Sequence, residues 1–401
     1  MRKIDLNNFR VATSETARDI NRRIVLNLIR KHQPVSRADL ARHSGLQRST
    51  VSAITEQLIA ERWVMEGAAG HLPRGRRPTF LHLNAERAGI VGVTIRPMGT
   101  TIVLARLDTS FLAQSSMATD GNAEEFVNRL TRRVSELVKS HPEISFEGIG
   151  ISVPGRIDER THRLVFAPNL KWRNLDLKGP LEQATGLPVA VENAANACAL
   201  AELWCGRHSE SIRNLIAVTV AEGIGVGMIL NGQLVRGTTG MAGEFGHVSL
   251  NEDGPICNCG NRGCWEAYAS DQAAIRYYCE SGPPADGNGG ERTAAPLFAD
   301  LLRLARQGDA RAGAALDRMA HYLGLGLAML ISGFSPDAIV ITGDVTEAWD
   351  RVEPILIEVV RNRCPVLSMP RIQPTDPATQ PRLRGSIALF LQQHFGVPQG
   401  L

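Results

Sequence analysis

The chain has 401 residues, of which 43% are hydrophobic and 21% charged, a composition typical of a globular protein with two or three domains. No run approaches the roughly 18 consecutive apolar residues that a membrane helix requires, and the first ten residues contain no apolar segment like that of a signal peptide. These features argue against export and membrane insertion, so we expect a cytoplasmic protein without a membrane partner.

Charge is unevenly distributed along the chain. Residues 1–82 contain 15 Lys/Arg and seven Asp/Glu, whereas residues 83–401 contain 29 and 34. A basic N-terminal part on an acidic remainder indicates that only the N-terminal part meets a polyanion.

Residues 1–82 have the pattern of a winged helix-turn-helix domain. Apolar residues at helical spacing predict three helices, at 16–31, from Ser36 to the break at Gly45, and at about 47–60. Two strand-like runs, at 63–65 and 79–83, flank a basic loop that we interpret as the wing. This domain is predicted to bind double-stranded DNA.

Polar side chains gather at the start of the second and third helices, where a recognition helix enters the major groove. The predicted contacts there are Arg37, Gln47, Arg48, Ser49, Thr50 and Ser52. The wing adds Arg74, Arg76 and Arg77 beside a glycine. These arginines suit either a narrow minor groove or contacts to phosphates alone, and the sequence leaves both open.

From residue 88 onward, strand-like runs such as Ile90–Thr94, Ile149–Val153 and residues 215–220 alternate with helices, one of them at about 266–280, in two successive α/β lobes. The sequence contains no short-period repeat. The first lobe is predicted over 88–196, with a C-terminal helix at about 383–397 packing back on it. The second is predicted over 197–380, and residues 282–291 form a glycine-rich surface insertion.

Three cysteines and one histidine fall within a short segment of the second lobe. Cys257, Cys259 and Cys264 follow His247, and glycines between them allow the chain to turn back on itself. A Cys₃His set is a closed tetrahedral zinc site with no position left for water, so we predict a structural Zn²⁺. The alternative is a group of buried free cysteines.

The winged helix, the glycine-rich stretch from Gly223 to His247 and the segment CNCGNRGCWE together resemble the ROK family of repressors, open reading frames and sugar kinases. The resemblance covers nearly the whole chain and is closest to the repressor branch, which contains sugar-responsive regulators. It implies an actin-like, two-lobed sugar-kinase fold with a sugar-binding cleft. It also implies self-association through the second lobe, as a homodimer or homotetramer, and zinc that supports the sugar-binding loops.

The resemblance also implies which side chains contact the sugar. The residues that match the family's sugar-binding positions, one by one, are Asn169, Asn193, Glu244, His247 and Glu266. His247 is expected to bind zinc through one ring nitrogen and to approach the sugar through the other. For Asn169 and Asn193 the alternative role is to cap a turn or a helix.

Two departures from the family's kinases concern catalysis. Ala194 stands where those kinases carry the catalytic Asp, and Thr94–Thr100 lacks the acid and glycines of their phosphate loop. Glu222 also places an acid where a phosphate would lie. We therefore predict no kinase activity and assign no catalytic residue.

The sequence thus favours a sugar-responsive repressor that binds an inverted-repeat operator through two heads. Two alternatives stay open: a sugar kinase with a DNA-binding appendage, and a regulator controlled by a protein partner. Activation in place of repression is also open, since a helix-turn-helix does not reveal the sign.

Overall fold

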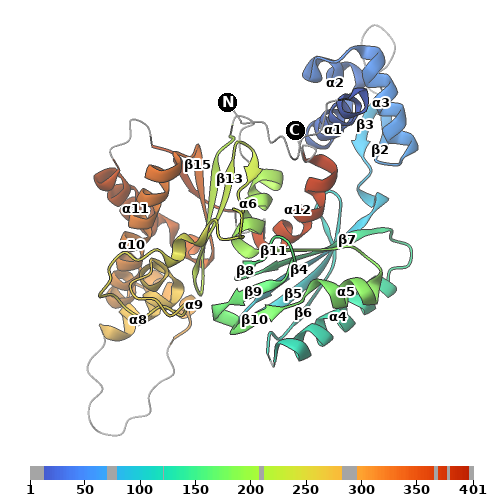
Figure 1. Ribbon diagram of the computed structural model, residues 1–401. Coiled ribbons are helices and arrows are strands. Elements are labelled where there is room, and N and C mark those ends of the chain that lie inside the picture. The colour runs from blue at the N-terminus through green and yellow to red at the C-terminus, as the bar shows by residue number, and fades with distance from the viewer. Residues whose placement is uncertain are drawn as a thin grey trace.

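The computed structural model describes residues 13–69, 79–120, 122–206, 212–281, 296–364, 369–376 and 380–396. These residues form a small N-terminal head and a body built around two five-stranded sheets (Figure 1). Among the described helices, none is long and apolar enough to cross a membrane.

The head has the predicted winged helix-turn-helix arrangement. Its helices and strands are α1 (Ser14–His32), β1 (Val35–Ser36), α2 (Arg37–Ser44), α3 (Arg48–Ala60), β2 (Val64–Ala69) and β3 (Thr79–Leu83). The Ser36 side chain accepts a hydrogen bond from the Asp39 backbone at the start of α2, and Gly45 ends α2 in the left-handed conformation with φ 72°. The wing tip, with Arg74, Arg76 and Arg77, lies outside the described residues.

The first sheet has the strand order β11-β7-β4-β5-β6. Its strands are β4 (Gly89–Arg96), β5 (Gly99–Arg106), β6 (Phe111–Met117), β7 (Phe146–Val153) and β11 (Val189–Asn193). The accompanying elements are α4 (Ala123–Lys139), α5 (Lys178–Thr185) and a small sheet of β8 (Arg156–Ile157), β9 (Leu164–Ala167) and β10 (Trp172–Leu175).

The second sheet has the strand order β14-β13-β12-β15-β16. Its strands are β12 (Leu215–Val220), β13 (Ile224–Leu230), β14 (Gln233–Leu234), β15 (Ala338–Thr342) and β16 (Arg371–Pro374). The helices that accompany it are α7 (Glu266–Ala269), α8 (Asp271–Glu280), α9 (Phe298–Arg306), α10 (Ala310–Phe334) and α11 (Trp349–Arg363).

The two sheets share one topology. In each, the first three strands in chain order form an antiparallel meander, and the next two add in parallel on the other side of the first strand. A repeated sheet of this kind is the architecture expected of a two-lobed actin-like body. The repetition is topological, since the sequence analysis found no short-period repeat.

Two helices lie between the sheets. The helix α6 (Ala194–Cys205) contacts β12 and β13, α12 (Pro381–Phe395) contacts β4 and β7, and the two helices contact each other (Figure 1). The C-terminal helix therefore packs on the first sheet. The predicted lobe limit between residues 196 and 197 falls within α6, so the division into lobes stays an interpretation.

The predicted helix at 266–280 is two helices. Ser270 interrupts it with extended backbone, and its hydroxyl accepts a hydrogen bond from the Ala273 amide at 3.3 Å to start α8. Such a capping serine is compatible with either a continuous or a broken helix in sequence. The glycine-rich insertion at 282–291 lies outside the part of the chain that the structure describes.

The Glu147 carboxylate interacts with two side chains, Arg87 and His394, on the side of the body that faces the head. Glu147 accepts from Arg87 Nη1 at 2.5 Å and interacts with His394 Nε2 at 3.0 Å, and Arg87 also lies over the Trp63 ring of the head. The hydrogen bond to His394 and the Arg87 guanidinium lower the pKa of Glu147 to about 2, against the opposing effect of burial.

We predict that Glu147→Gln lowers the free energy of unfolding by about 1–2 kcal/mol at pH 7, after discounting the pKa shift for solvent screening. A carboxylate whose pKa is depressed in the folded state stabilises it above the ordinary pKa near 4.5 and loses this contribution as pH falls toward 2. The difference between wild type and variant should therefore shrink as pH falls below about 4.5 in urea titrations. The exposed neighbour Glu143→Gln is the control; equal effects of the two variants would contradict the prediction.

Candidate functional site

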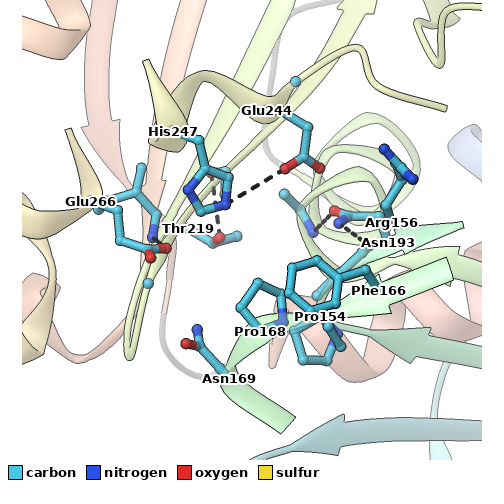
Figure 2. Close-up of a pocket in the computed structure, with 18 of the residues that line it drawn as sticks. Pro154, Arg156, Phe166, Pro168, Asn169, Asn193, Thr219, Glu244, His247 and Glu266 are labelled. Carbon is cyan, nitrogen blue, oxygen red and sulfur yellow. Dashed lines mark hydrogen bonds and ion pairs between the residues drawn. The ribbon is translucent and has the colours of Figure 1, made fainter. Parts of the chain in front are cut away.

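A cavity of about 330 Å³ opens where the loops of the two lobes meet. Its walls come from the ends of β4, β7 and β11 in the first lobe and from the β12–β13 turn and the Gly240–His247 loop in the second. Ligand sites of open α/β sheets commonly lie at such strand ends. All five predicted sugar contacts line this cleft: Asn169, Asn193, Glu244, His247 and Glu266 (Figure 2).

Asn193 starts α6 at the floor of the cleft. Its Oδ1 accepts from the backbone amides of Ala195 at 2.8 Å and Asn196 at 3.3 Å, and its Nδ2 donates to the Gly155 carbonyl at 2.8 Å. Helix capping, the alternative role considered for this residue, is therefore present. One hydrogen of the amide is left over for a ligand.

Asn169 lies on the opposite wall, in the short 3₁₀ turn Pro168–Leu170. Its Oδ1 accepts from Asn258 Nδ2 at 3.1 Å. Asn258 sits between Cys257 and Cys259, so this hydrogen bond joins the first lobe to the cysteine segment of the second. Asn258 could not be predicted from the sequence, because its role depends on the approach of the two lobes.

Two glutamates face the cleft from the second lobe. Glu266 is buried; its Oε2 accepts from the Ile224 amide at 3.0 Å, and its Oε1 lies 3.4 Å from Cys257 Sγ. Glu244 Oε2 lies 3.7 Å from His247 Nε2. Burial raises the pKa of Glu244, opposed by the nearby His247 and Arg156. The carboxylates thus present oxygen acceptors that a hydroxylated ligand can meet.

His247 joins the cleft to the cysteine cluster. Its Nδ1 lies 3.7 Å from Cys257 Sγ, while its Nε2 faces Glu244 on the cleft side (Figure 2). This arrangement has the geometry expected from the sequence, in which one ring nitrogen serves a metal and the other a ligand.

The cysteine cluster has the dimensions of a metal site. The ligand atoms of His247, Cys257, Cys259 and Cys264 all lie within 4.8 Å of one another, and Cys259 Sγ is 3.7 Å from Cys264 Sγ. Two thiolates bound tetrahedrally to one ion at about 2.3 Å are roughly 3.8 Å apart. The residues therefore fit a tetrahedral ion.

The protonation of the cluster depends on a cation. Burial, reinforced by neighbouring acidic groups, raises the pKa of the Cys257 thiol and raises that of Cys264 to about 11. Bare thiols would thus stay protonated at neutral pH, whereas a bound cation favours the thiolates.

Charged side chains also lie near the end of β4, where the first lobe approaches the second. Arg96 Nη2 of the first lobe lies 3.5 Å from Glu222 Oε1 of the second. Asp271 is 6% exposed, and its Oδ1 has no hydrogen-bond partner among the described residues. Burial, with Asp344 and Glu222 nearby, raises the pKa of Asp271 to about 7.

The predicted DNA contacts divide into three groups. Gln47, Arg48 and Ser49 are exposed at the start of α3, and Thr50 and Ser52 are half-buried. Arg37 Nη2 donates to Glu66 Oε1 at 2.9 Å, so this arginine is engaged within the head. The wing arginines lie outside the described residues.

Several cleft residues escaped the sequence analysis. Arg156, Phe166 and Met241 line the cavity, and Arg156 Nη1 lies 2.9 Å from Met241 Sδ across it. The turn Pro154–Gly155 directly after a buried strand was the available signal for Arg156.

Comparison with known proteins identifies both parts of the chain. Residues 92–392 match the ROK family, and residues 25–66 match the IclR helix-turn-helix domain. The chain is 32% identical over 345 residues to the xylose repressor of Bacillus subtilis, covering 85% of this chain and 86% of that protein. It is 34% identical over 276 residues to a glucokinase of Streptomyces coelicolor, covering 65% of this chain and 84% of the glucokinase.

Among solved structures, the chain is similar to a ROK family transcriptional regulator described as a homologue of the Escherichia coli MLC protein. The TM-score is 0.77 at 25% identity, over 95% of this chain and 98% of that one. The predicted two-lobed sugar-kinase fold with an N-terminal helix-turn-helix domain is therefore confirmed. The chain belongs to the ROK family.

Proposed function

We propose that the protein is a transcriptional repressor that binds operator DNA through its head and releases it when a sugar binds in the cleft. The observation that carries this proposal is the match to a xylose repressor along 85% of the chain, whereas the match to a glucokinase covers 65%. The repressor match extends beyond the body into the head. The head is accordingly a working part of the protein and DNA its partner.

The cleft supports a sugar as the effector. Glu244, His247 and Glu266 present acceptors and a ring nitrogen from one wall, and Asn169 faces them from the other (Figure 2). Adjacent hydroxyls of a sugar bind such groups in pairs, and a wrong epimer leaves one of them unpaired at a cost of about 1–3 kcal/mol.

We propose that the cleft does not transfer phosphate. Ala194 has no group that accepts the proton of an attacking hydroxyl, and the Arg96 guanidinium is already paired with Glu222. Phosphoryl transfer depends on positioning and on neutralising negative charge, and Glu222 adds a negative charge to this part of the cleft. The glucokinase similarity then reflects the shared fold and sugar site.

The cysteine cluster is proposed to hold a structural Zn²⁺. His247, Cys257, Cys259 and Cys264 would fill all four positions, and the ion would fix the loops that carry Glu244 and Glu266. With Nδ1 turned to the thiolates, His247 keeps Nε2 for the cleft. The cluster is thereby a support for the sugar site.

The head is proposed to read DNA with the start of α3, where Gln47, Arg48 and Ser49 are exposed. Self-association through the second lobe, as a homodimer or homotetramer, would present two heads to an inverted repeat. Arg37 is proposed to leave Glu66 when DNA is bound, since the ion pair is exposed and weak.

The first test is fluorescence anisotropy of the full-length protein on DNA from upstream of its own gene, against random DNA, with a panel of sugars that includes D-xylose. We expect preference for its own DNA and a five-fold or greater loss of affinity with one sugar, the usual range of allosteric coupling. Preference that no sugar changes would contradict a sugar effector. Sugar-dependent ADP formation from ATP would contradict the non-enzymatic assignment.

The same assay tests the cleft with Glu244→Gln. Losing the carboxylate should abolish the sugar response and leave operator affinity without sugar within about two-fold, because Glu244 lines the cleft, whose lining includes no residue of the head. The control is Glu252→Gln, an exposed residue of the neighbouring loop that should keep the response. A response retained in Glu244→Gln would place the sugar elsewhere.

Arg48→Ala tests the DNA-reading role of α3. If Arg48 reads a base, the substitution costs about 1–3 kcal/mol on the operator and little on random DNA. Anisotropy at two salt concentrations separates the outcomes. A uniform loss on both DNAs, with a smaller salt dependence, would mean that Arg48 contacts a phosphate.

Cys259→Ala tests the metal proposal. We expect loss of one zinc per chain, measured by plasma mass spectrometry, and a fall in melting temperature of roughly 5–10 °C, corresponding to ~2–3 kcal/mol. Cys279→Ala is the control, because Cys279 is exposed and lies outside the cluster. Unchanged zinc content and melting temperature in Cys259→Ala would refute the structural ion.

A further inference from the structure

The two helices between the lobes run in the same direction, from the cleft to the head. Asn193 and Ala194 at the start of α6 line the cleft, as does Arg382 at the start of α12. The other ends, at Trp204 and Phe395, meet α1 of the head (Figure 1). With 12 and 15 residues, the helices span about 18 and 22 Å.

The packing of these helices leaves little room for independent movement. A Cβ atom on Gly385 of α12 would lie 2.3 Å from the Ala197 carbonyl oxygen of α6, and one on Gly150 of β7 would lie 1.8 Å from that of Ser386. Backbone therefore packs directly on backbone. Close-packed elements of this kind shift as units between discrete arrangements.

The head holds the far ends of both helices through one face of α1. Arg23 Nη1 donates to the Gly396 carbonyl at 2.8 Å, Asn27 Nδ2 to that of Phe395 at 2.6 Å, and Arg30 Nη1 to that of Trp204 at 3.0 Å. The last carbonyls of a helix lack partners within it and carry the negative end of its dipole. Arg23, Asn27 and Arg30 of α1 supply hydrogen-bond donors to these carbonyls, and the two arginines also bring positive charge.

Arg30 contacts both helices. Its guanidinium lies 5.2 Å from the Trp204 ring centroid of α6 and 5.3 Å from that of Phe395 of α12. Burial lowers the pKa of Arg30, and its Nε is buried without a hydrogen-bond partner among the residues described. This cation is thus held in place by ring faces and one carbonyl.

We propose that Arg30 is the positioning residue through which the cleft and the DNA-binding head sense each other, with α6 and α12 as the connecting elements. A change at the start of either helix moves its far end against Arg30. Because α1 packs on α2 and α3, the recognition helix follows. The inference rests on the proposed function, since it names how the sugar and DNA sites are coupled.

Linkage makes the coupling testable from the DNA side alone, with no sugar. We would measure hydrogen exchange of the full-length protein with and without the DNA duplex from upstream of its own gene. In the wild type, DNA should change the exchange rates of peptides at 193–197 and 381–386 by about three-fold or more. In Arg30→Met these peptides should not respond to DNA that the variant still binds.

Two further variants keep the result interpretable. Arg30→Lys retains the charge but loses the planar group that stacks on Trp204 and Phe395, and should also lose the response. Arg18→Met removes an exposed charge from the same helix and should keep the response of the cleft peptides to DNA. An unresponsive cleft in the wild type, or a wild-type response in Arg30→Met, would overturn the inference. So would loss of all DNA binding by Arg30→Lys at an unchanged melting temperature, since Arg30 would then belong to the DNA-binding surface.

A D-xylose arm separates this inference from the proposed function. If D-xylose weakens operator binding equally in wild type and Arg30→Met, the sugar effector stands and the role of Arg30 fails. If DNA changes exchange at the cleft only when Arg30 is intact, but D-xylose has no effect, the coupling stands and this sugar is the wrong effector.

Discussion

The contact of α6 with α12 between the two sheets is the constraint on which the rest of this structure depends. Each helix covers one sheet, and glycines at Gly150 and Gly385 let backbone approach backbone at both faces of α12. The two lobes are therefore joined through two closely packed helices. The cleft lies at one end of these two helices, and the head contacts their other end. The cleft and the head are therefore connected by the same pair of helices.

The sequence predicted those parts of the molecule whose signals are local. The three helices of the head, the strands around Ile90, Ile149 and Ile216, and the metal cluster all follow from periodicity or from ligand spacing within one short segment. The cleft residues came from the family resemblance and do line one cavity. The broken helix at Ser270 was missed because a serine is compatible with both a helix interior and a cap.

Features that depend on distant segments could not be predicted in this way. Asn258 meets Asn169, and Arg30 meets Trp204, only because the chain folds 89 and 174 residues back on itself. The edge strand β6 and the short strands β8–β10 also went unrecognised, since runs of two to seven residues with mixed polarity give weak periodicity. Asn193 shows a further limit, because its amide both caps α6 and faces the cleft, and a motif cannot separate the two roles.

The ion pair between Arg96 and Glu222 is a weak connection between the two lobes. Arg96 and Glu222 join the two lobes at 3.5 Å, with side chains 38% and 21% exposed. A pair at this distance and exposure contributes about 0–1 kcal/mol. A ligand that distinguishes two lobe arrangements supplies about 1–3 kcal/mol. Under the proposed function, the ion pair therefore biases the cleft toward one arrangement without fixing it, and the larger contribution of the ligand decides which arrangement the helices present to Arg30 and the head.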